Sequence, residues 1–215
     1  MKKNLQIRIT TSMALILLLG LAFLSKIFLV IALLIFSILS IIEFFNISKK
    51  IFNKNIFQII SNILFIFYIF IFSIIFFNLS SFDYLKIILF SLILCCIGSD
   101  LGGFIFGKIF KGPKLTKISP NKTISGSIGS LIFACIFFSL IFYLFNFYLN
   151  FQILIIGLFT SVACQIGDLF FSYLKRRAFL KDTGNFLPGH GGILDRVDGI
   201  LIGVPFGLFT ILIIF

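Results

Sequence analysis

The sequence predicts an all-α, polytopic integral membrane protein with about seven transmembrane helices. Its 215 residues are 60% hydrophobic and include 33 Phe, whereas charged residues make up only 12%. A water-soluble domain of this size cannot bury so much apolar side chain. The apolar runs are nearly continuous and lack the two-residue alternation of a barrel strand, so we expect the spans to be helices.

Seven helix-length apolar segments follow one another along the chain. The first and fourth are short for a bilayer that needs about 20 residues, so one of them is either re-entrant or extended by its flanks. The basic start of the chain has no small-residue cleavage site, so we expect the first span to be retained. The spans are placed at residues 10–24, 27–46, 57–77, 85–98, 127–149, 152–171 and 197–215.

The positive charges indicate the orientation of these spans. With a cytoplasmic N-terminus, every Lys and Arg except Lys26 and Lys86 falls on the cytoplasmic side, as the positive-inside rule requires. The same arrangement explains the net charge of +11 without a nucleic-acid partner. We therefore expect a multi-pass protein of the cell inner membrane. Residues 1–98 form N-terminal transmembrane helices, and 99–215 form a catalytic region with cytoplasmic loops at 99–126 and 172–196.

The densest polar segment is residues 172–198, with five Lys or Arg, three Asp and the only His. Asp168 lies near the cytoplasmic end of the sixth span, and Asp195 and Asp198 lie at the start of the seventh. Carboxylates at the ends of neighbouring helices can share a Mg²⁺ ion. Carboxylate-held Mg²⁺ beside basic groups suits phosphoryl or nucleotidyl transfer. The basic groups near these carboxylates are Lys175, Arg176, Lys181 and Arg196.

Each of these residues also has a simpler interpretation, which stays open. Asp195 can cap the seventh helix, Asp168 can pair with Lys175, and His190 can be a structural loop residue. Taken together, these interpretations leave the Gly/Pro-rich loop unexplained. The four cysteines lie in apolar runs without CxxC spacing, so we expect small buried side chains rather than a metal site or disulfides.

Two further polar features lie outside this segment. In the 99–126 loop, Ser119 begins a turn and Lys122 precedes the Gly/Ser-rich start of the fifth helix. Such a start can cradle phosphate, with Lys122 as the counter-charge, although a flexible basic loop is the alternative. Glu43 lies near the end of the second span, and we expect it to reach the interface rather than to act in catalysis.

Residues 172–198 resemble the signature of the phosphatidate cytidylyltransferases (CDP-diacylglycerol synthases) at every fixed position. The segment QIGDLFFSYLKRR and the Ser119-Pro-x-Lys122-Thr123 run are also similar to that family. The resemblance extends over about 99–203, and the first 98 residues match only in hydropathy. Ser125-Gly126 stands where the family commonly has Glu-Gly, and Leu101 where Thr or Ser is usual. The matching signature positions are Ser172, Lys175, Arg176, Lys181, Asp182, Gly184, Leu187, Pro188, His190, Gly191, Gly192, Ile193, Asp195, Arg196, Val197 and Asp198.

The resemblance implies that CTP and phosphatidic acid react to give CDP-diacylglycerol and diphosphate, with Mg²⁺ as cofactor. It implies metal ligation by Asp168 and Asp195, and charge stabilisation by Lys181 and Arg196. Substrate contacts would come from Ser119, Lys122, Lys175, Arg176, His190 and Asp198. Membrane lipid is the other expected partner, and homo-oligomerisation is left open.

Three other functions compete with this interpretation. A related cytidylyltransferase could act on a different anionic lipid, because the apolar spans would set acyl selectivity. A transporter would need polar or broken helices near the bilayer midplane, and the third and fifth spans have almost none. The intact set of Asp168, Asp195 and Asp198 argues against an inactive homologue.

Overall fold

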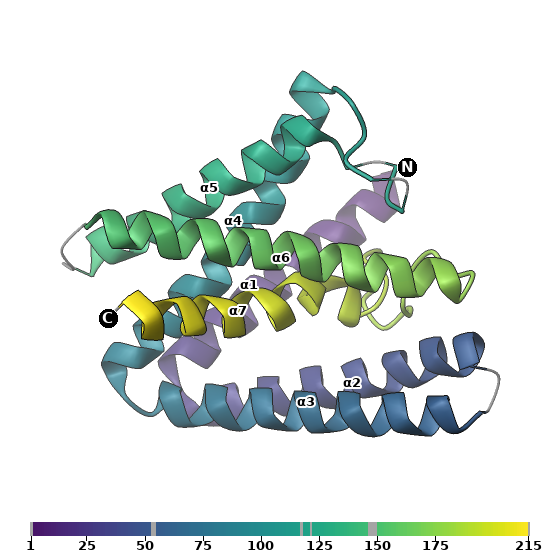
Figure 1. The fold of residues 1–215 in the computed structure, drawn as a ribbon. Helices are drawn as coiled ribbons and strands as arrows, with labels where there is room; N and C mark the ends of the chain where they lie inside the picture. Colours follow the sequence, from purple (N-terminus) through teal and green to yellow (C-terminus); the bar gives the residue numbers. More distant parts are fainter. Residues whose placement is uncertain (1, 53–54, 117, 121, 146–149, 215) are drawn as a thin grey trace. The chain divides into compact units, whose positions relative to one another are not determined.

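The computed structural model describes residues 2–52, 55–116, 118–120, 122–145 and 150–214. Within these ranges the chain forms seven helices and no strand, which confirms the predicted all-α fold (Figure 1). All seven helices are long and apolar enough to cross a membrane. They are α1 (Lys2–Leu24), α2 (Lys26–Phe52), α3 (Ile56–Ser80), α4 (Asp83–Phe110), α5 (Ile124–Leu144), α6 (Phe151–Arg177) and α7 (Leu194–Ile214).

The two spans that looked short are full-length helices. Helix α1 has 23 residues and α4 has 28, because each helix continues through flanking residues outside the predicted span. The expected loops are correspondingly shorter than predicted. The first lies between Phe110 and Ile124, and the second between Arg177 and Leu194. Residues 146–149, the expected end of the fifth span, lie outside the described residues.

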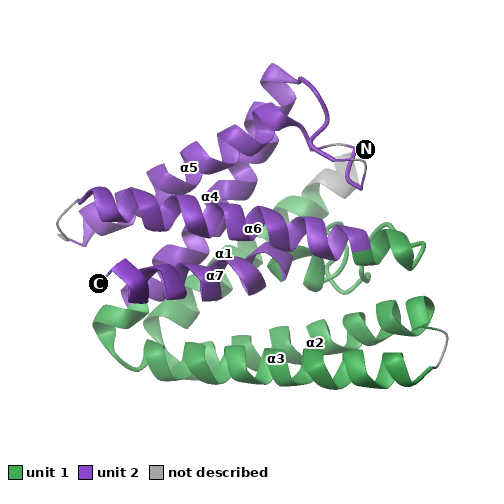
Figure 2. Ribbon diagram, in the orientation of Figure 1, with its two compact units in different colours: residues 1–86, 174–197 green, residues 87–173, 198–215 purple. Residues whose placement is uncertain are grey.

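The helices group into two compact units (Figure 2). Unit 1 comprises residues 1–86 and 174–197, and unit 2 comprises residues 87–173 and 198–215. Helices α6 and α7 each contribute residues to both units. The predicted division of the chain at residue 98, into N-terminal helices and a catalytic region, concerns function, and it stays a prediction.

Unit 1 joins α2 to α3 through aromatic and hydroxyl contacts. The rings of Phe44 and Phe65 stack with centroids 3.9 Å apart. The hydroxyl of Ser48 donates to Asn62 Oδ1 over 2.6 Å. Polar side chains inside a membrane protein find partners on neighbouring helices, because lipid offers none.

Unit 2 depends on glycines that let helices approach closely. A Cβ on Gly102 of α4 would lie 2.3 Å from the carbonyl oxygen of Gly129 on α5. In the same way, a Cβ on Gly167 of α6 would lie 2.7 Å from the carbonyl oxygen of Asp198 on α7. Small residues at such contacts allow backbone-to-backbone packing in membranes. The contact at Gly167 brings the start of α7 in this unit against Asp168.

Candidate functional site

Asp168, in unit 2, lies among groups that suit a bound cation. One carboxylate oxygen from Asp168, one from Asp100 and Cys164 Sγ all lie within 4.8 Å of one another. Asp100 is exposed at the surface of α4, whereas Asp168 is half-buried on α6. Oxygen ligands suit Mg²⁺ and thiolates suit softer metals, so the two carboxylates form the donor pair that fits Mg²⁺.

Lys122 completes this group. Its Nζ lies 3.0 Å from Asp168 Oδ2, so the partner of Asp168 is Lys122 rather than the Lys175 that we considered. Lys122 belongs to the loop between α4 and α5, which folds back so that Lys122 reaches Asp168. The Lys122 amide donates to the Ser119 carbonyl over 3.0 Å, and Thr123 caps α5 by accepting from Gly126 N. The described residues of this loop thus place an ammonium group beside a carboxylate.

The start of α7 in unit 2 also approaches Asp168. A Cβ on Gly199 would lie 2.8 Å from Asp168 Oδ1, so only glycine leaves room for this carboxylate. Asp198 is buried, and its Oδ1 accepts from Gly199 N over 2.9 Å. Asp168, Lys122 and Asp198 therefore lie at one end of unit 2.

Four donor groups in unit 1 lie within hydrogen-bond distance of the Asp195 carboxylate. Its Oδ1 accepts from Lys175 Nζ over 2.6 Å. Its Oδ2 accepts from Thr183 N at 2.8 Å and from Gly192 N at 3.1 Å, and it lies 3.0 Å from Thr183 Oγ1. The Asp195 side chain is only 8% exposed. A cation would reach Oδ1 only by displacing Lys175, and joint ligation with Asp168 stays a prediction because the two residues belong to different units.

The remaining basic residues of the signature lie at the surface of unit 1. Lys181 is exposed, and so are Arg176 and Arg196. Arg196 Nη2 donates to the carbonyl of His190 over 2.7 Å, and Arg176 Nη1 donates to the carbonyl of Leu180 over 3.3 Å. Both guanidinium groups brace the loop and still present N–H groups to solution.

His190 faces helix α1. Its Nδ1 lies 2.6 Å from Thr11 Oγ1, and its Nε2 lies 3.3 Å from Ser12 Oγ. Arg8 Nε donates to the neighbouring Gly189 carbonyl over 2.9 Å. Partial burial lowers the pKa of His190, and the charges of Arg196 and Arg8 lower it further. These contacts support a structural role for the imidazole, and its predicted contact with substrate stays a prediction.

Sequence reasoning missed the partners of Glu43, whose side chain is fully buried against the loop that precedes α7. The place of Glu43 relative to the membrane interface stays a prediction. Its Oε1 accepts from Ile193 N over 2.9 Å. Its Oε2 accepts from Leu194 N over 2.8 Å and from Thr183 Oγ1 over 2.6 Å. The available signal was the cost of a lone carboxylate in an apolar run, which demands a polar partner.

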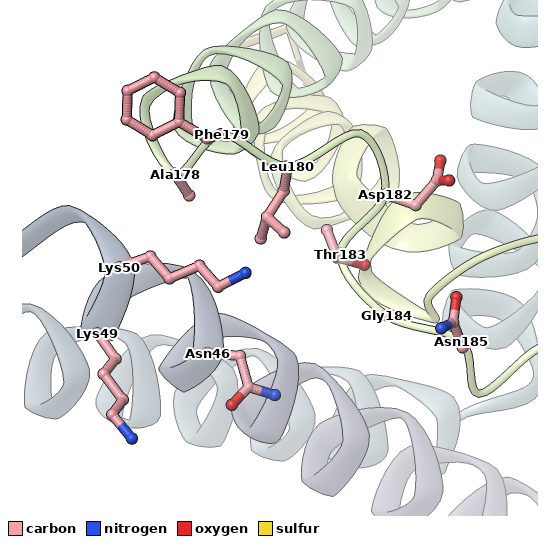
Figure 3. A pocket seen from close by; sticks show the side chains of 10 residues that line it. All are labelled: Asn46, Lys49, Lys50, Ala178, Phe179, Leu180, Asp182, Thr183, Gly184 and Asn185. Carbon is pink, nitrogen blue, oxygen red and sulfur yellow. The ribbon is translucent and has the colours of Figure 1, made fainter.

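A pocket of about 850 Å³ lies in unit 1 between the end of α2 and residues 178–185 (Figure 3). The amino group of Lys50 points toward this segment (Figure 3), and Lys49 and Asp182 also line the pocket. Asn46 and Asn185 add amide groups to the lining. The pocket therefore offers a cation and hydrogen-bond donors beside the loop between α6 and α7, residues 178–193, which we call the signature loop.

Fold and sites together define a helical membrane protein whose carboxylates are paired with lysines at two polar sites, as suits phosphorylated substrates. The chain belongs to the Cytidylyltransferase family, whose model matches residues 3–214.

Curated relatives named phosphatidate cytidylyltransferase are similar to part of the chain. The Bacillus subtilis protein is 42% identical over 115 residues, which are 53% of this chain and 43% of that protein. The Rickettsia felis protein is 40% identical over 126 residues, or 54% and 56% of the two chains. The Staphylococcus haemolyticus protein is 41% identical over 134 residues, or 61% and 50%. The chain thus spans about half the length of the curated relatives it matches.

Proposed function

We propose that this chain is a Mg²⁺-dependent phosphatidate cytidylyltransferase that converts CTP and phosphatidic acid into CDP-diacylglycerol and diphosphate. Family membership supports the nucleotidyl-transfer class, and the names of the relatives support the two substrates. The observation that carries the proposal is the cluster of Asp100, Asp168 and Lys122 in unit 2. Two carboxylates and an ammonium group together suit a cation-bound polyphosphate.

The chemistry is a displacement at phosphorus. A phosphate oxygen of phosphatidic acid forms a bond to the α-phosphorus of CTP, and the bond from that phosphorus to the bridging oxygen breaks as diphosphate leaves. The nucleophile is already ionised near neutral pH, so no general base is required. Mg²⁺, when bound, would offset the repulsion between the two anions and stabilise charge on the leaving group.

The chain's own groups have defined tasks in this scheme. Asp168, with Asp100, would hold the cation, and Lys122 would turn from Asp168 to a phosphate oxygen. Lys175 is poised to do the same from Asp195, while Lys181 and Arg196 contribute positive charge from the loop surface. We propose that the site opens on the cytoplasmic face of the cell inner membrane, where CTP arrives from water and the lipid from the leaflet.

The experiment is an assay of purified protein with cytidine-labelled CTP, phosphatidic acid and Mg²⁺. Label should appear in the lipid phase together with diphosphate, and a chelator should prevent both. Asp168→Asn and Asp195→Asn should each abolish turnover, and Asp100→Asn should weaken it. Asp83→Asn is the matched control, because Asp83 is an exposed carboxylate that pairs only with nearby Lys86 in the described structure. Substantial activity in Asp168→Asn would remove that residue from the metal site.

The pocket at Lys50 supports binding of a phosphate-bearing group, which is either the lipid head group or the CTP polyphosphate. Lys50→Met should raise the KM for one substrate by about tenfold, as expected for a lost contact that acts equally before and during reaction. Whichever KM rises identifies the occupant. Lys26→Met is the control, because Lys26 is an exposed lysine at the other end of α2 and does not line the pocket. Unchanged KM values in Lys50→Met would exclude the pocket as a substrate site.

A further inference from the structure

Helix α2 holds the signature loop through a single buried carboxylate. We propose that Glu43 is a positioning residue that fixes the Lys175–Asp195 pair in the geometry needed for nucleotidyl transfer. This inference rests on the proposed function. All three hydrogen bonds of Glu43 go to the segment from Thr183 to Leu194, which immediately precedes Asp195.

One connection runs through Thr183, which is only 4% exposed. Its hydroxyl lies 2.6 Å from Glu43 Oε2 and 3.0 Å from Asp195 Oδ2. A hydroxyl has one proton, and the shorter distance favours donation to Glu43. Thr183 N then donates to Asp195 Oδ2 over 2.8 Å, so Glu43 orients the residue whose backbone holds Asp195.

The second connection runs through the start of α7. The first N–H groups of a helix lack partners within the helix, and the positive end of the helix dipole favours an anion there. Glu43 accepts from Ile193 N and Leu194 N, so α2 supplies the cap for α7. Asp195 is the next residue, and its position follows from where this helix begins.

Two glycines in the loop make room for the Glu43 carboxylate. A Cβ on Gly184 would lie 2.6 Å from Glu43 Oε1, and a Cβ on Gly192 would lie 2.4 Å from Glu43 Oε2. Neither position has the positive φ that would itself call for glycine. The close approach of the carboxylate therefore explains why position 184 lacks a side chain, and at 192 the carboxylate acts together with the Thr183 hydroxyl, which lies closer still.

Capping of α7 gives Glu43 a part in stability, but a loop residue could supply such a cap, whereas a carboxylate inside a membrane helix is costly. A positioning residue must fix the geometry of the reacting groups precisely, because small displacements of those groups can lower the rate by about 10²-fold. The buried carboxylate therefore serves the placement of its neighbours.

The first test compares kinetics in four variants. Glu43→Gln and Thr183→Val should each lower kcat by about 10²-fold, as expected when reacting groups are slightly displaced. The KM values for CTP and phosphatidic acid should stay within about threefold. Thr183→Ser keeps the hydroxyl and should retain activity. Ser48→Ala, which removes a buried hydrogen bond from the same helix, should leave kcat unchanged.

The second test does not depend on activity. Hydrogen exchange of the backbone amides at residues 192–194 should be faster in Glu43→Gln, because a Gln side chain has one acceptor oxygen for donors that a carboxylate serves with two. The same amides should exchange at the wild-type rate in Ser48→Ala. If Glu43→Gln does not fold, the Thr183→Val and Thr183→Ser pair decides the question by the same two readouts.

The possible results separate the two proposals. If wild-type protein forms no lipid-linked cytidine, the proposed function fails, while the exchange data still report on the loop. If wild-type protein is active and Glu43→Gln has normal kcat or normal exchange at 192–194, the positioning role is wrong. Equal loss of kcat in Ser48→Ala would also overturn it, because the Ser48 hydroxyl donates to Phe45 and Asn62 rather than to the loop.

Discussion

At the scale of single residues, the signature divides into side chains that hold the loop and side chains that face solution. Asp195 and His190 have their polar atoms occupied by neighbours within unit 1. Lys181 and Arg196 are exposed and can approach a polyphosphate. These exposed side chains should therefore interact most directly with the charge on the leaving diphosphate.

Removing those exposed charges should therefore lower kcat. Lys181→Met and Arg196→Met should each reduce kcat by about 10²–10³-fold if each stabilises charge in the transition state. Arg177 lies outside the signature, and Arg177→Met should mainly weaken attraction to anionic lipid, by about 1 kcal/mol. Steady-state kinetics and binding to anionic vesicles measure the two effects. Equal, severe losses of kcat in all three variants would show that Arg177 belongs to the site.

His190 should make stability depend on pH. Burial and the charges of Arg196 and Arg8 lower its pKa in the folded protein, so the unfolded chain binds its proton more readily. The contribution of His190 to the free energy of unfolding is fully present above its ordinary pKa of about 6.5 and is lost as the pH falls below that value. The unfolding temperature of wild-type protein should thus fall more between pH 8 and pH 5 than that of His190→Asn. Parallel pH curves would contradict this.

At the scale of helices, close packing at glycine sets the stability of unit 2. Gly102→Ala should lower the unfolding temperature, because overpacking costs about 1–3 kcal/mol and the new Cβ meets backbone of α5. A Cβ on Gly20 of α1 would meet no other group within 4 Å. Gly20→Ala should therefore be neutral or stabilising by up to about 1 kcal/mol. Equal effects of the two substitutions would show that the α4–α5 approach is not tight.

Hydropathy predicted every helix, but it could not predict where the helices end. Helix α4 continues to Phe110 and α6 to Arg177, through charged residues and glycines outside the predicted spans. Asp168 and Lys122 were identified from charge in an apolar context, and the structure brings them together. The sequence did not reveal the neighbours of Glu43 and Asp100, because these lie more than 60 residues away along the chain and no local pattern indicates such contacts.

At the scale of the whole molecule, seven helices give a testable topology. In a background without the four native cysteines, Lys114→Cys and Asn185→Cys should be labelled only from the cytoplasmic side. Ser81→Cys should be labelled only from outside. The charge distribution and an even number of helices between the two loops lead to this expectation. Asn185 is preferable to Gly184 as a labelling site, because a side chain at 184 would meet Glu43. Labelling of 114 and 185 from opposite faces would contradict a shared cytoplasmic site.

The close packing of Gly184 and Gly192 against the Glu43 carboxylate also limits how the sequence of this protein can evolve. A methyl group at 184 or 192 collides with Glu43, so neither glycine can mutate freely while that glutamate remains. Glu43 in turn cannot be lost without leaving backbone N–H groups at the start of α7 without their acceptor. Positions 43 and 184 should therefore change together, although some 140 residues separate them, and a side chain should appear at 184 only in lineages that shorten residue 43. A side chain at 192 would still meet the Thr183 hydroxyl, so that position should stay glycine even then.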